Sequence, residues 1–527
     1  MERKTILLLR PPYGFTPSNE TSSLHIPLGL LYIASPLLNS GYDVKVIDGN
    51  LPDRDIDTWQ EKSGNLYFGV HWEGIEQKIK RLDFDIAGIS AQFSVQFRNT
   101  KILVELIKKI KPDCKVVVGG AHATVRHKQI LEEIPEIDVV ISGEGEISFS
   151  ELVNRFYSNE KLDNISGLTW RDEDRIVENA GPRPIADIDG IMLPAYDLID
   201  MERYLEVMGR FPTRTYYGER PGITVITSRG CPFQCTFCSV HLHMGRRWRG
   251  HSPEYIINHL ELLVKKYNIQ YFHFEDDDLT ANPARFEKIL DKIIEKKMDI
   301  WWDTPNGVRA DSFTQKVMDK CKISGCKFLI FGVESGSQRV LNNVIKKSLK
   351  LKDVEKACYY AKKSGVISRA FFIMGLPGEK KIDILKTSYF MIKLALKYNT
   401  FGGTNFAIPL FGTELYRISI DKKYLKDDLT YENFALVYTK EGMLHTEEFD
   451  PDFVLRVIGT TEKILYYLEI VIFFKRIVRS PLLIKYILIE LKKGICIKEM
   501  KRIFNEIVFW LPEENMAGYR KRERLSG

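Results

Sequence analysis

Short apolar runs alternate with amphipathic segments over the first 157 residues of this 527-residue chain. The runs are rich in β-branched residues and end near Gly, Asp or Ser; they read KTILLLR, YDVKVID, FDIAGIS, KVVVGG and DVVISG. Segments between them, such as 26–38 and 100–110, space their apolar residues as a helix does. This alternation predicts right-handed βαβ units and a doubly wound, Rossmann-like parallel sheet.

Small and polar residues follow the predicted strands of this sheet. Ligands of such sheets bind at the carboxyl ends of the strands, and glycine there lets a ligand approach the backbone closely. No G-x-G-x-x-G follows the first strand, which disfavours a dinucleotide. The candidate ligand contacts are Ser90, Gly119, Gly120, Gly143, Glu144, Gly145 and Glu146.

A second alternating series begins at Ile223. Its predicted strands are ITVITSRG, YFHFEDDD, IWWDTPNGVRA, KFLIFGVES, SRAFFIMGLP and TNFAIPLF, with helices between them, for example 253–266 and 314–323. Six consecutive βα units with polar or glycine-rich strand ends predict a partial (β/α)6 TIM-like barrel whose active face lies at those ends. Before it, residues 158–222 read as a bridge with a hairpin around ISGLTWRDEDRIVENA and a Pro-rich run.

The last region, from about Asp421, is predicted to be mostly helical. Glu469 and a basic cluster interrupt its most apolar part, so no run approaches the ~20 residues that a membrane span needs. We therefore expect four parts: a Rossmann-like domain over 1–157, a bridging segment over 158–222, the barrel over 223–419 and a helical C-terminal region over 420–527.

Charge is concentrated near the C-terminus. From Lys475 onward there are 13 Lys and Arg against 6 Asp and Glu, while the whole chain carries a net charge of +6. The near-neutral remainder gives no indication of nucleic acid binding. Basic residues beside Ile, Leu and Phe suit a helix lying on an anionic membrane surface, although the interpretation that we favour is a basic helical cap on the barrel.

The overall composition, 44% hydrophobic and 28% charged, is that of a globular chain with large cores. The N-terminal stretch MERKTILLLRPPYG lacks the features of a signal peptide, so we expect a reducing, cytoplasmic location, with peripheral contact to the inner face of the membrane as the alternative that the C-terminal charge suggests. In such a compartment, clustered cysteines indicate metal ligands or catalytic thiols rather than structural disulfides.

The stretch SRGCPFQCTFCS holds three of the eight cysteines: Cys231, Cys235 and Cys238. They follow the first barrel strand, where a loop can wrap around a ligand. A structural zinc site needs four ligands, and only His241 and His243 stand near enough to complete one. Three thiolates could instead hold three irons of a 4Fe-4S cube and leave the fourth iron open. By spacing the cluster is favoured, with zinc and incidental thiols as alternatives.

The other five cysteines give no second metal site. Cys114, Cys358 and Cys496 are isolated in the sequence, and Cys321 and Cys326 flank a helix end without further partners. Their expected role is that of small buried apolar side chains.

The pattern C-x-x-x-C-x-aromatic-C, with Phe237 before the last cysteine, resembles the signature of the radical S-adenosylmethionine (SAM) enzymes. Motifs at later strand ends resemble that family in the same order, over roughly residues 200–420. The resemblance implies SAM contacts at the following places: Glu275 and Asp276 at the methionine amino group, Glu334 and Ser335 at the ribose and carboxylate, FFIMGLPGE (371–379, with Gly375) at the adenine, and PLFGTELY (409–416) after the sixth strand.

Family resemblance also implies the chemistry. SAM would chelate the open iron, and the reduced cluster would cleave it to a 5'-deoxyadenosyl radical able to take hydrogen from carbons that no acid or base could reach, with an electron donor such as a flavodoxin or ferredoxin. The barrel would position the cofactor and exclude water. Arg309 could pair with the SAM carboxylate, or form a structural ion pair.

Before such a barrel, the first domain resembles the cobalamin-binding domain of the cobalamin-dependent subfamily. The loop after its first strand, RPPYGFTPSNETSSLH, lacks the D-x-H-x-x-G motif that supplies a histidine to cobalt in other cobalamin proteins. His25 lacks the motif's neighbours, so we expect the lower face of cobalt to be open. His122 could hydrogen-bond the corrin or simply cap a helix.

The predicted function is therefore that of a cobalamin-dependent radical SAM enzyme that methylates an unactivated carbon of a small-molecule or lipid substrate. The alternative within the family is an oxidative cyclase or ring-rearranging enzyme without methyl transfer. A third possibility, a non-catalytic cobalamin or cluster sensor, would need an output module, and none is visible in the sequence. The substrate and the catalytic hydrogen or proton donor have no sequence signal.

Overall fold

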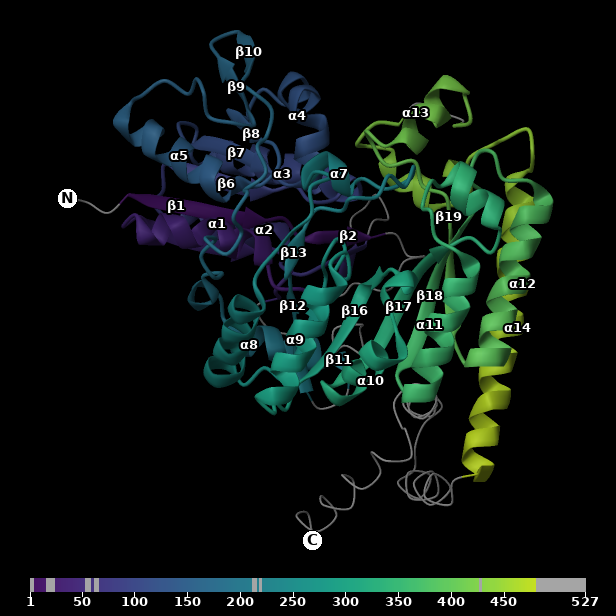
Figure 1. Ribbon diagram of the computed structural model, residues 1–527. Helices are drawn as coiled ribbons and strands as arrows, with labels where there is room; N and C mark the ends of the chain where they lie inside the picture. Colours follow the sequence, from purple (N-terminus) through teal and green to yellow (C-terminus); the bar gives the residue numbers. More distant parts are fainter. Residues whose placement is uncertain are drawn as a thin grey trace. The chain divides into compact units, whose positions relative to one another are not determined.

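A computed structural model describes residues 4–15, 24–52, 58–60, 66–210, 216–217, 220–425 and 429–479 (Figure 1). The chain forms two compact units. The first comprises Met1–Ile300 with Ile408–Leu444, and the second comprises Trp301–Ala407 with His445–Gly527.

All five strands predicted in the first domain are present. They are β1 (Thr5–Arg10), β3 (Asp43–Asp48), β6 (Ile86–Ser90), β7 (Lys115–Gly119) and β8 (Val139–Ile141). They pair in parallel within a seven-stranded sheet of order β10-β9-β8-β7-β6-β1-β3. The strand order turns back at β1, which is where ligands of doubly wound sheets bind.

Alternation along the strands explains why helices cover both faces. Leu7 and Leu9 of β1 pack with apolar residues of α2 (Trp72–Lys80), α3 (Phe97–Ile110) and α4 (Ala121–Glu133). Ile6 and Leu8 point to the opposite face and pack with α1 (Leu28–Asn39) and α5 (Gly145–Ser158). Successive strand side chains point to opposite faces, so a near-continuous apolar run is what a sheet covered on both sides requires.

The predicted hairpin of the bridge is present as β9 (Leu168–Asp172) and β10 (Arg175–Glu178). It belongs to the first sheet, because β9 pairs antiparallel with β8. Two further small sheets were not predicted. One consists of β2 (Tyr13–Phe15), β5 (Leu66–Phe68) and β4 (Thr58–Gln60), and the other of β13 (Ser228–Arg229) and β14 (Arg249–Gly250). Helix α6 (Met201–Arg210) follows the Pro-rich run.

The six strands of the second series are also present, and they form the predicted partial barrel. In the first unit β11 (Tyr216–Tyr217), β12 (Arg220–Val225) and β15 (Tyr271–Phe274) are neighbours, with β12 and β15 parallel. Helices α8 (Pro253–Tyr267) and α9 (Pro283–Glu295) follow them. Ser252 and Asn282 start these helices by accepting a hydrogen bond from a backbone N–H of the first turn.

The second unit holds the remaining parallel strands β16 (Trp301–Val308), β17 (Cys326–Glu334), β18 (Ile367–Met374) and β19 (Phe401–Phe406), paired in that order. Helices α10 (Gln315–Ile323), α11 (Leu351–Ser364) and α12 (Lys381–Tyr398) connect them. Trp302, Phe331 and Phe372 are fully buried in its core.

The described part of the C-terminal region contains α13 (Glu414–Asp421), two short 3-10 turns at 434–438 and 440–442, and the long α14 (Pro451–Arg479). Helix α14 runs beside α12 in the second unit (Figure 1). Most of the predicted basic cluster and Cys496 lie outside the described residues. Within the described chain, no helix is both long and apolar enough to cross a membrane.

Candidate functional site

The three motif cysteines lie on one loop between β13 and the short helix α7 (Val240–His243). Cys231, Cys235 and Cys238 are half-buried and form no disulfide. The backbone N–H of Cys238 donates to the carbonyl of Cys235 at 3.1 Å, and that of Cys231 to the carbonyl of Gly245 at 3.4 Å. These backbone hydrogen bonds hold the loop back against residue 245.

The electrostatics of this loop suit a cationic centre. Burial raises the pKa of the Cys231 thiol to about 12, and the neighbouring Asp278, Cys238 and Cys235 add to the rise. Three thiolates would repel one another in this loop, and iron atoms bound to them would remove the repulsion. Among the described residues, no three His, Cys, Asp or Glu side chains converge tightly enough to hold a metal ion. In a 4Fe-4S cluster each thiolate would bind a different iron. The three thiols therefore need not converge on a single metal ion, and the residues present fit such a cluster.

Gly230 fixes the start of the cysteine loop. Its φ of +80° is a conformation that side chains rarely adopt, and a Cβ there would lie 2.7 Å from the carbonyl oxygen of Arg247. Its backbone nitrogen donates to Asp277 Oδ2 at 2.7 Å. Asp277, which the sequence analysis did not single out, thus ties the end of β15 to the loop.

Glu275 and Asp276, predicted at the SAM amino group, occupy different environments. Asp276 is 2% exposed and its Oδ1 accepts from Thr227 N at 3.0 Å and Ser228 Oγ at 2.5 Å. Its Oδ2 is buried with no partner among the described residues, which leaves one acceptor for a bound ammonium. Glu275 is half-buried. Burial raises the pKa of Asp276 against the lowering effect of Ser228 and Arg285.

His25 lies next to Glu275. Its Nδ1 is 3.8 Å from Glu275 Oε1 and 3.2 Å from Thr224 Oγ1. This histidine therefore contacts residues of the first barrel strands.

Both carboxylate oxygens of Glu144, a predicted cobalamin contact, bind protein. Oε1 lies 2.8 Å from Arg229 Nη1, and Oε2 lies 2.5 Å from Arg249 Nη1. Oε2 also accepts from the backbone nitrogen of Ile185 at 2.8 Å. Arg229 pairs in addition with Glu146 at 2.6 Å. Burial lowers the pKa of Arg229, but the pairs with Glu146 and Glu144 outweigh it and raise that pKa above its usual value.

The carboxyl edge of the first sheet collects the other predicted cobalamin residues. Ser90 and Gly119 are partners in register, and the ends of β7 and β8 are aligned beside them. A Cβ on Gly119 would meet only the Ile141 carbonyl oxygen, at 3.7 Å. A Cβ on Gly120, whose φ is +119°, would lie 2.7 Å from the Ala91 carbonyl oxygen. Gly119 is therefore the open position for a ligand at this edge.

Gly143 and Gly145 face protein. A Cβ at Gly143 would lie 2.6 Å from Pro182, and one at Gly145 would lie 2.7 Å from Ile33. These two glycines permit the close packing of the bridge and of α1, and they do not leave room for a ligand at their Cβ positions.

His122 is 4% exposed in the first turn of α4, and its Nδ1 contacts Ser94 Oγ at 2.8 Å. Burial lowers its pKa to about 3, so the ring is neutral. Its ring lies 4.5 Å from that of Phe97. Its side chain does not cap α4, and its contact with the corrin stays a prediction.

In the second unit, three predicted SAM contacts are engaged with protein. Arg309 pairs with Asp311 at 2.6 Å and donates to the Lys347 carbonyl at 3.0 Å, which is the structural ion pair left open above. Glu334 accepts from Lys347 Nζ at 2.7 Å. Ser335 is fully buried against Thr387, at 3.1 Å between the two hydroxyls. The Ser335 side chain thus supports the strand end from inside, and its contact with SAM stays a prediction.

The fifth-strand motif is shaped by Glu379, a residue that the sequence analysis quoted only within its motif. Gly375, in the left-handed region with φ +86°, and Leu376 donate their backbone N–H to Glu379 Oε2 at 2.7 and 2.9 Å. One carboxylate therefore fixes the backbone that is predicted to contact adenine.

The motif 409–416 belongs to the first unit. Phe411 lies 5.9 Å from the ring of His122, and Arg126 lies 4.8 Å above the Phe411 ring. The backbone nitrogen of Leu415 donates to the carbonyl of Thr236 at 2.9 Å. The segment after the sixth strand therefore joins α4 to the cysteine loop.

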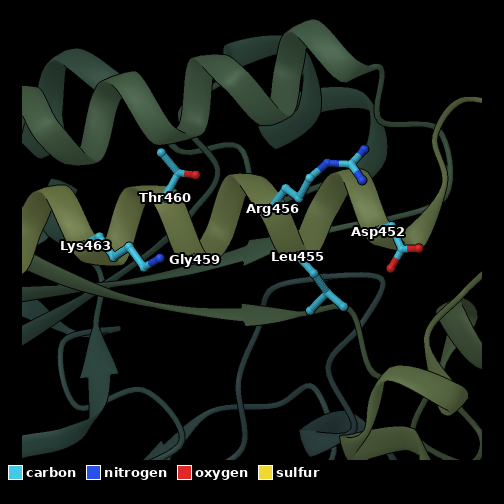
Figure 2. A pocket seen from close by; sticks show the side chains of 6 residues that line it. All are labelled: Asp452, Leu455, Arg456, Gly459, Thr460 and Lys463. Carbon is cyan, nitrogen blue, oxygen red and sulfur yellow. The ribbon is translucent and has the colours of Figure 1, made fainter.

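Other candidate features carry less chemistry. Cys114, Cys321, Cys326 and Cys358 are buried, as predicted for apolar packing. An open hollow runs along α14 between its polar side chains, and it contains none of the predicted site residues (Figure 2). Its lining residues are Asp452, Leu455, Arg456, Gly459, Thr460 and Lys463.

Comparison with known proteins defines the class. Residues 19–153 match the B12 binding domain family and residues 225–390 match the Radical SAM superfamily. The chain is 34% identical over 429 residues to an uncharacterized methyltransferase of Pyrococcus horikoshii, covering 81% of this chain and 85% of that one. This protein therefore belongs to the cobalamin-dependent radical SAM enzymes, and the predicted cofactors cobalamin, SAM and a 4Fe-4S cluster are those of its family.

Other relatives differ in the reaction that their names give. Cytidylyl-2-hydroxyethylphosphonate methyltransferase of Streptomyces wedmorensis is 29% identical, with 80% of this chain and 82% of that one covered. An anaerobic magnesium-protoporphyrin IX monomethyl ester cyclase of Rubrivivax gelatinosus is 25% identical, with 74% and 65% covered.

Solved structures support the fold. The radical SAM methyltransferase TsrM of Kitasatospora setae superposes with a TM-score of 0.66 at 14% identity, over 87% of this chain and 91% of that one. The cobalamin-dependent SAM radical enzyme OxsB gives 0.67 at 17% identity, over 94% and 71%.

Proposed function

We propose that this enzyme transfers a methyl group to an unactivated carbon of a small-molecule or lipid substrate. The observation that carries the proposal is the buried contact between the turn after β8 in the cobalamin-binding domain and the strands that frame the cysteine loop. A fold that holds its cluster loop against its cobalamin domain suits a reaction in which both cofactors act on one substrate. Similarity over 429 residues to a methyltransferase supports the same reaction.

When bound, the cluster and SAM supply a carbon-centred radical and cobalamin carries the methyl group. Cys231, Cys235 and Cys238 would hold the cluster. Asp276 Oδ2 and Glu275 are the proposed contacts of the amino group of SAM, and the backbone at Gly375 is the proposed adenine contact. Ser90 and Gly119 are the proposed cobalamin contacts at the open edge of the first sheet.

An anaerobic turnover assay tests the proposal. The reconstituted protein is incubated with SAM, a reductant, cobalamin and a candidate substrate, and both SAM products are quantified. Methyl transfer predicts 5'-deoxyadenosine and S-adenosylhomocysteine in comparable amounts with a methylated substrate. Formation of 5'-deoxyadenosine without S-adenosylhomocysteine would contradict methyl transfer and favour the cyclase or ring-rearranging alternative, which the similarity to the Rubrivivax gelatinosus cyclase supports.

Membrane contact and an electron donor of the flavodoxin or ferredoxin class belong to the same proposal. The described end of α14 exposes Tyr466, Tyr467 and Phe474, between 55% and 65% of each side chain. Exposed aromatic residues beside basic ones are typical of helices that lie on anionic lipid. Flotation with anionic liposomes would show association of the protein with lipid, and a protein that stays with the unbound fraction would contradict the membrane proposal.

A further inference from the structure

One cluster of buried charges joins the β8–α5 turn to the stem of the cysteine loop. Glu144, at the start of α5, binds Arg229 of β13 and Arg249 of β14, which lie 85 and 105 residues further along the chain. The exposed fractions of these three side chains are 1%, 7% and 3%. Ion pairs so removed from water are weakly screened and hold their partners in one geometry.

The two arginines control the ends of the loop. Arg229 directly precedes Gly230, whose backbone nitrogen is itself fixed by Asp277. Arg249 donates through Nη2 to the Met244 carbonyl at 3.0 Å and through Nη1 to the Ile185 carbonyl at 2.7 Å. Since β13 and β14 pair with each other, a displacement of Glu144 would displace both strands of the stem together.

Glu144 stands between the sheet edge and this stem. The turn that carries it follows β8, whose end is aligned with the end of β7 and Gly119, the open position of the cobalamin edge. A ligand that orders this edge would therefore also order the carboxylate that the arginines bind.

We propose that Glu144 is a positioning residue that couples occupancy of the cobalamin edge to the conformation of the cysteine loop, so that cobalamin and SAM bind cooperatively. The inference rests on the proposed function, because it requires both cofactors. Coupling between two ligands is reciprocal: the factor by which SAM tightens cobalamin binding equals the factor by which cobalamin tightens SAM binding.

The coupling is measured on the cluster-reconstituted full chain. The dissociation constant of hydroxocobalamin is determined by absorbance titration with and without SAM, and amide hydrogen exchange of residues 228–250 is followed with and without hydroxocobalamin. In the native protein we expect SAM to tighten cobalamin binding by about tenfold, within the usual range of coupling. We also expect cobalamin to slow exchange in the loop. In Glu144→Gln both effects should vanish, while cobalamin still binds.

Glu151→Gln is the matched control, because Glu151 lies on the same helix in a half-buried pair with Arg155 that does not touch the cysteine loop's stem. It should keep the native coupling. If Glu144→Gln does not fold, Glu146→Gln removes only the outer pair with Arg229 and should reduce the coupling partially. Equal coupling in native protein and in the folded variant, or no coupling in the native protein although cobalamin binds, would overturn the inference. A native protein that binds no cobalamin would instead overturn the proposed function.

Discussion

Glu379 Oε2 accepts a hydrogen bond of 2.7 Å from the backbone nitrogen of Gly375, four residues earlier. The same oxygen accepts from Leu376, while Oε1 is buried with no partner in the described part of the chain. Burial raises the pKa of Glu379 to about 7, against the lowering effect of these two backbone donors. A carboxyl group so placed holds the predicted adenine-binding backbone and is sensitive to pH.

Glu379→Gln should change how stability depends on pH. Between about pH 4.5 and 7 the folded protein keeps the proton that the unfolded chain has lost, so rising pH favours unfolding. The stabilising contribution is complete below the unfolded pKa and is lost as pH rises through 7. The glutamine of the variant does not titrate in this range. Relative to the variant, the free energy of unfolding of the native protein should therefore fall by up to about 3 kcal/mol between pH 5 and 8. Urea unfolding at both pH values measures this, and a pH-independent difference would contradict it.

Cys235→Ala should remove the cluster. Loss of one of three thiolates leaves a second iron without a protein ligand, so iron content should fall well below about four per chain and SAM cleavage should stop. Cys358→Ala is the control, since Cys358 is fully buried in α11, and it should keep its iron with a stability loss of about 1 kcal/mol. Iron analysis and the 5'-deoxyadenosine yield measure the two variants. Undiminished SAM cleavage in Cys235→Ala would contradict the assignment of the motif.

The strands and the cysteine motif could be predicted because their signals are local. Runs such as TILLLR must be buried on both faces, and a spacing of three and two residues between cysteines fits a single loop. The contacts of Glu144 could not be predicted, because Arg229 and Arg249 are brought to it only by the packing of the first sheet on the loop's stem. Charged residues on both sides of the motif, in SRGC and RRWRG, were the available hint.

Two predicted residue pairs at strand ends have members in different surroundings. Glu275 and Asp276 follow the end of β15, and Glu334, the last residue of β17, has a φ of +68°, so strand alternation does not fix their side-chain directions. The structure places Asp276 against Thr227 and Ser228, and buries Ser335 against Thr387. Glu275 is half-buried beside the buried Asp276, whereas Glu334 and Ser335 are both buried, so the sequence pattern alone could not separate the members of each pair.

Lys347→Met should destabilise the second unit. Lys347 and Glu334 form a pair in which both side chains are about nine-tenths buried, so removing the ammonium leaves a buried charge at a cost of about 3–5 kcal/mol. Combining it with Glu334→Gln should recover part of this loss. Lys356→Met breaks an exposed pair with Asp353 and should cost less than about 1 kcal/mol. Urea unfolding of the native protein, the single variants Lys347→Met and Glu334→Gln and the double variant forms the cycle, and strictly additive losses for the buried pair would contradict the coupling.

Gly230→Ala should distort the cysteine loop. With φ at +80° and the Arg247 carbonyl 2.7 Å from the added Cβ, the loop must move, and we expect a stability loss of at least about 1–2 kcal/mol together with lower iron content. Gly29→Ala is the matched control. It lies in α1, its added Cβ would meet nothing within 4 Å, and alanine there should stabilise the helix by up to about 1 kcal/mol. Thermal unfolding and iron analysis after reconstitution measure both variants. Native iron content and melting temperature in Gly230→Ala would show that the turn at Gly230 does not set the position of the cluster ligands.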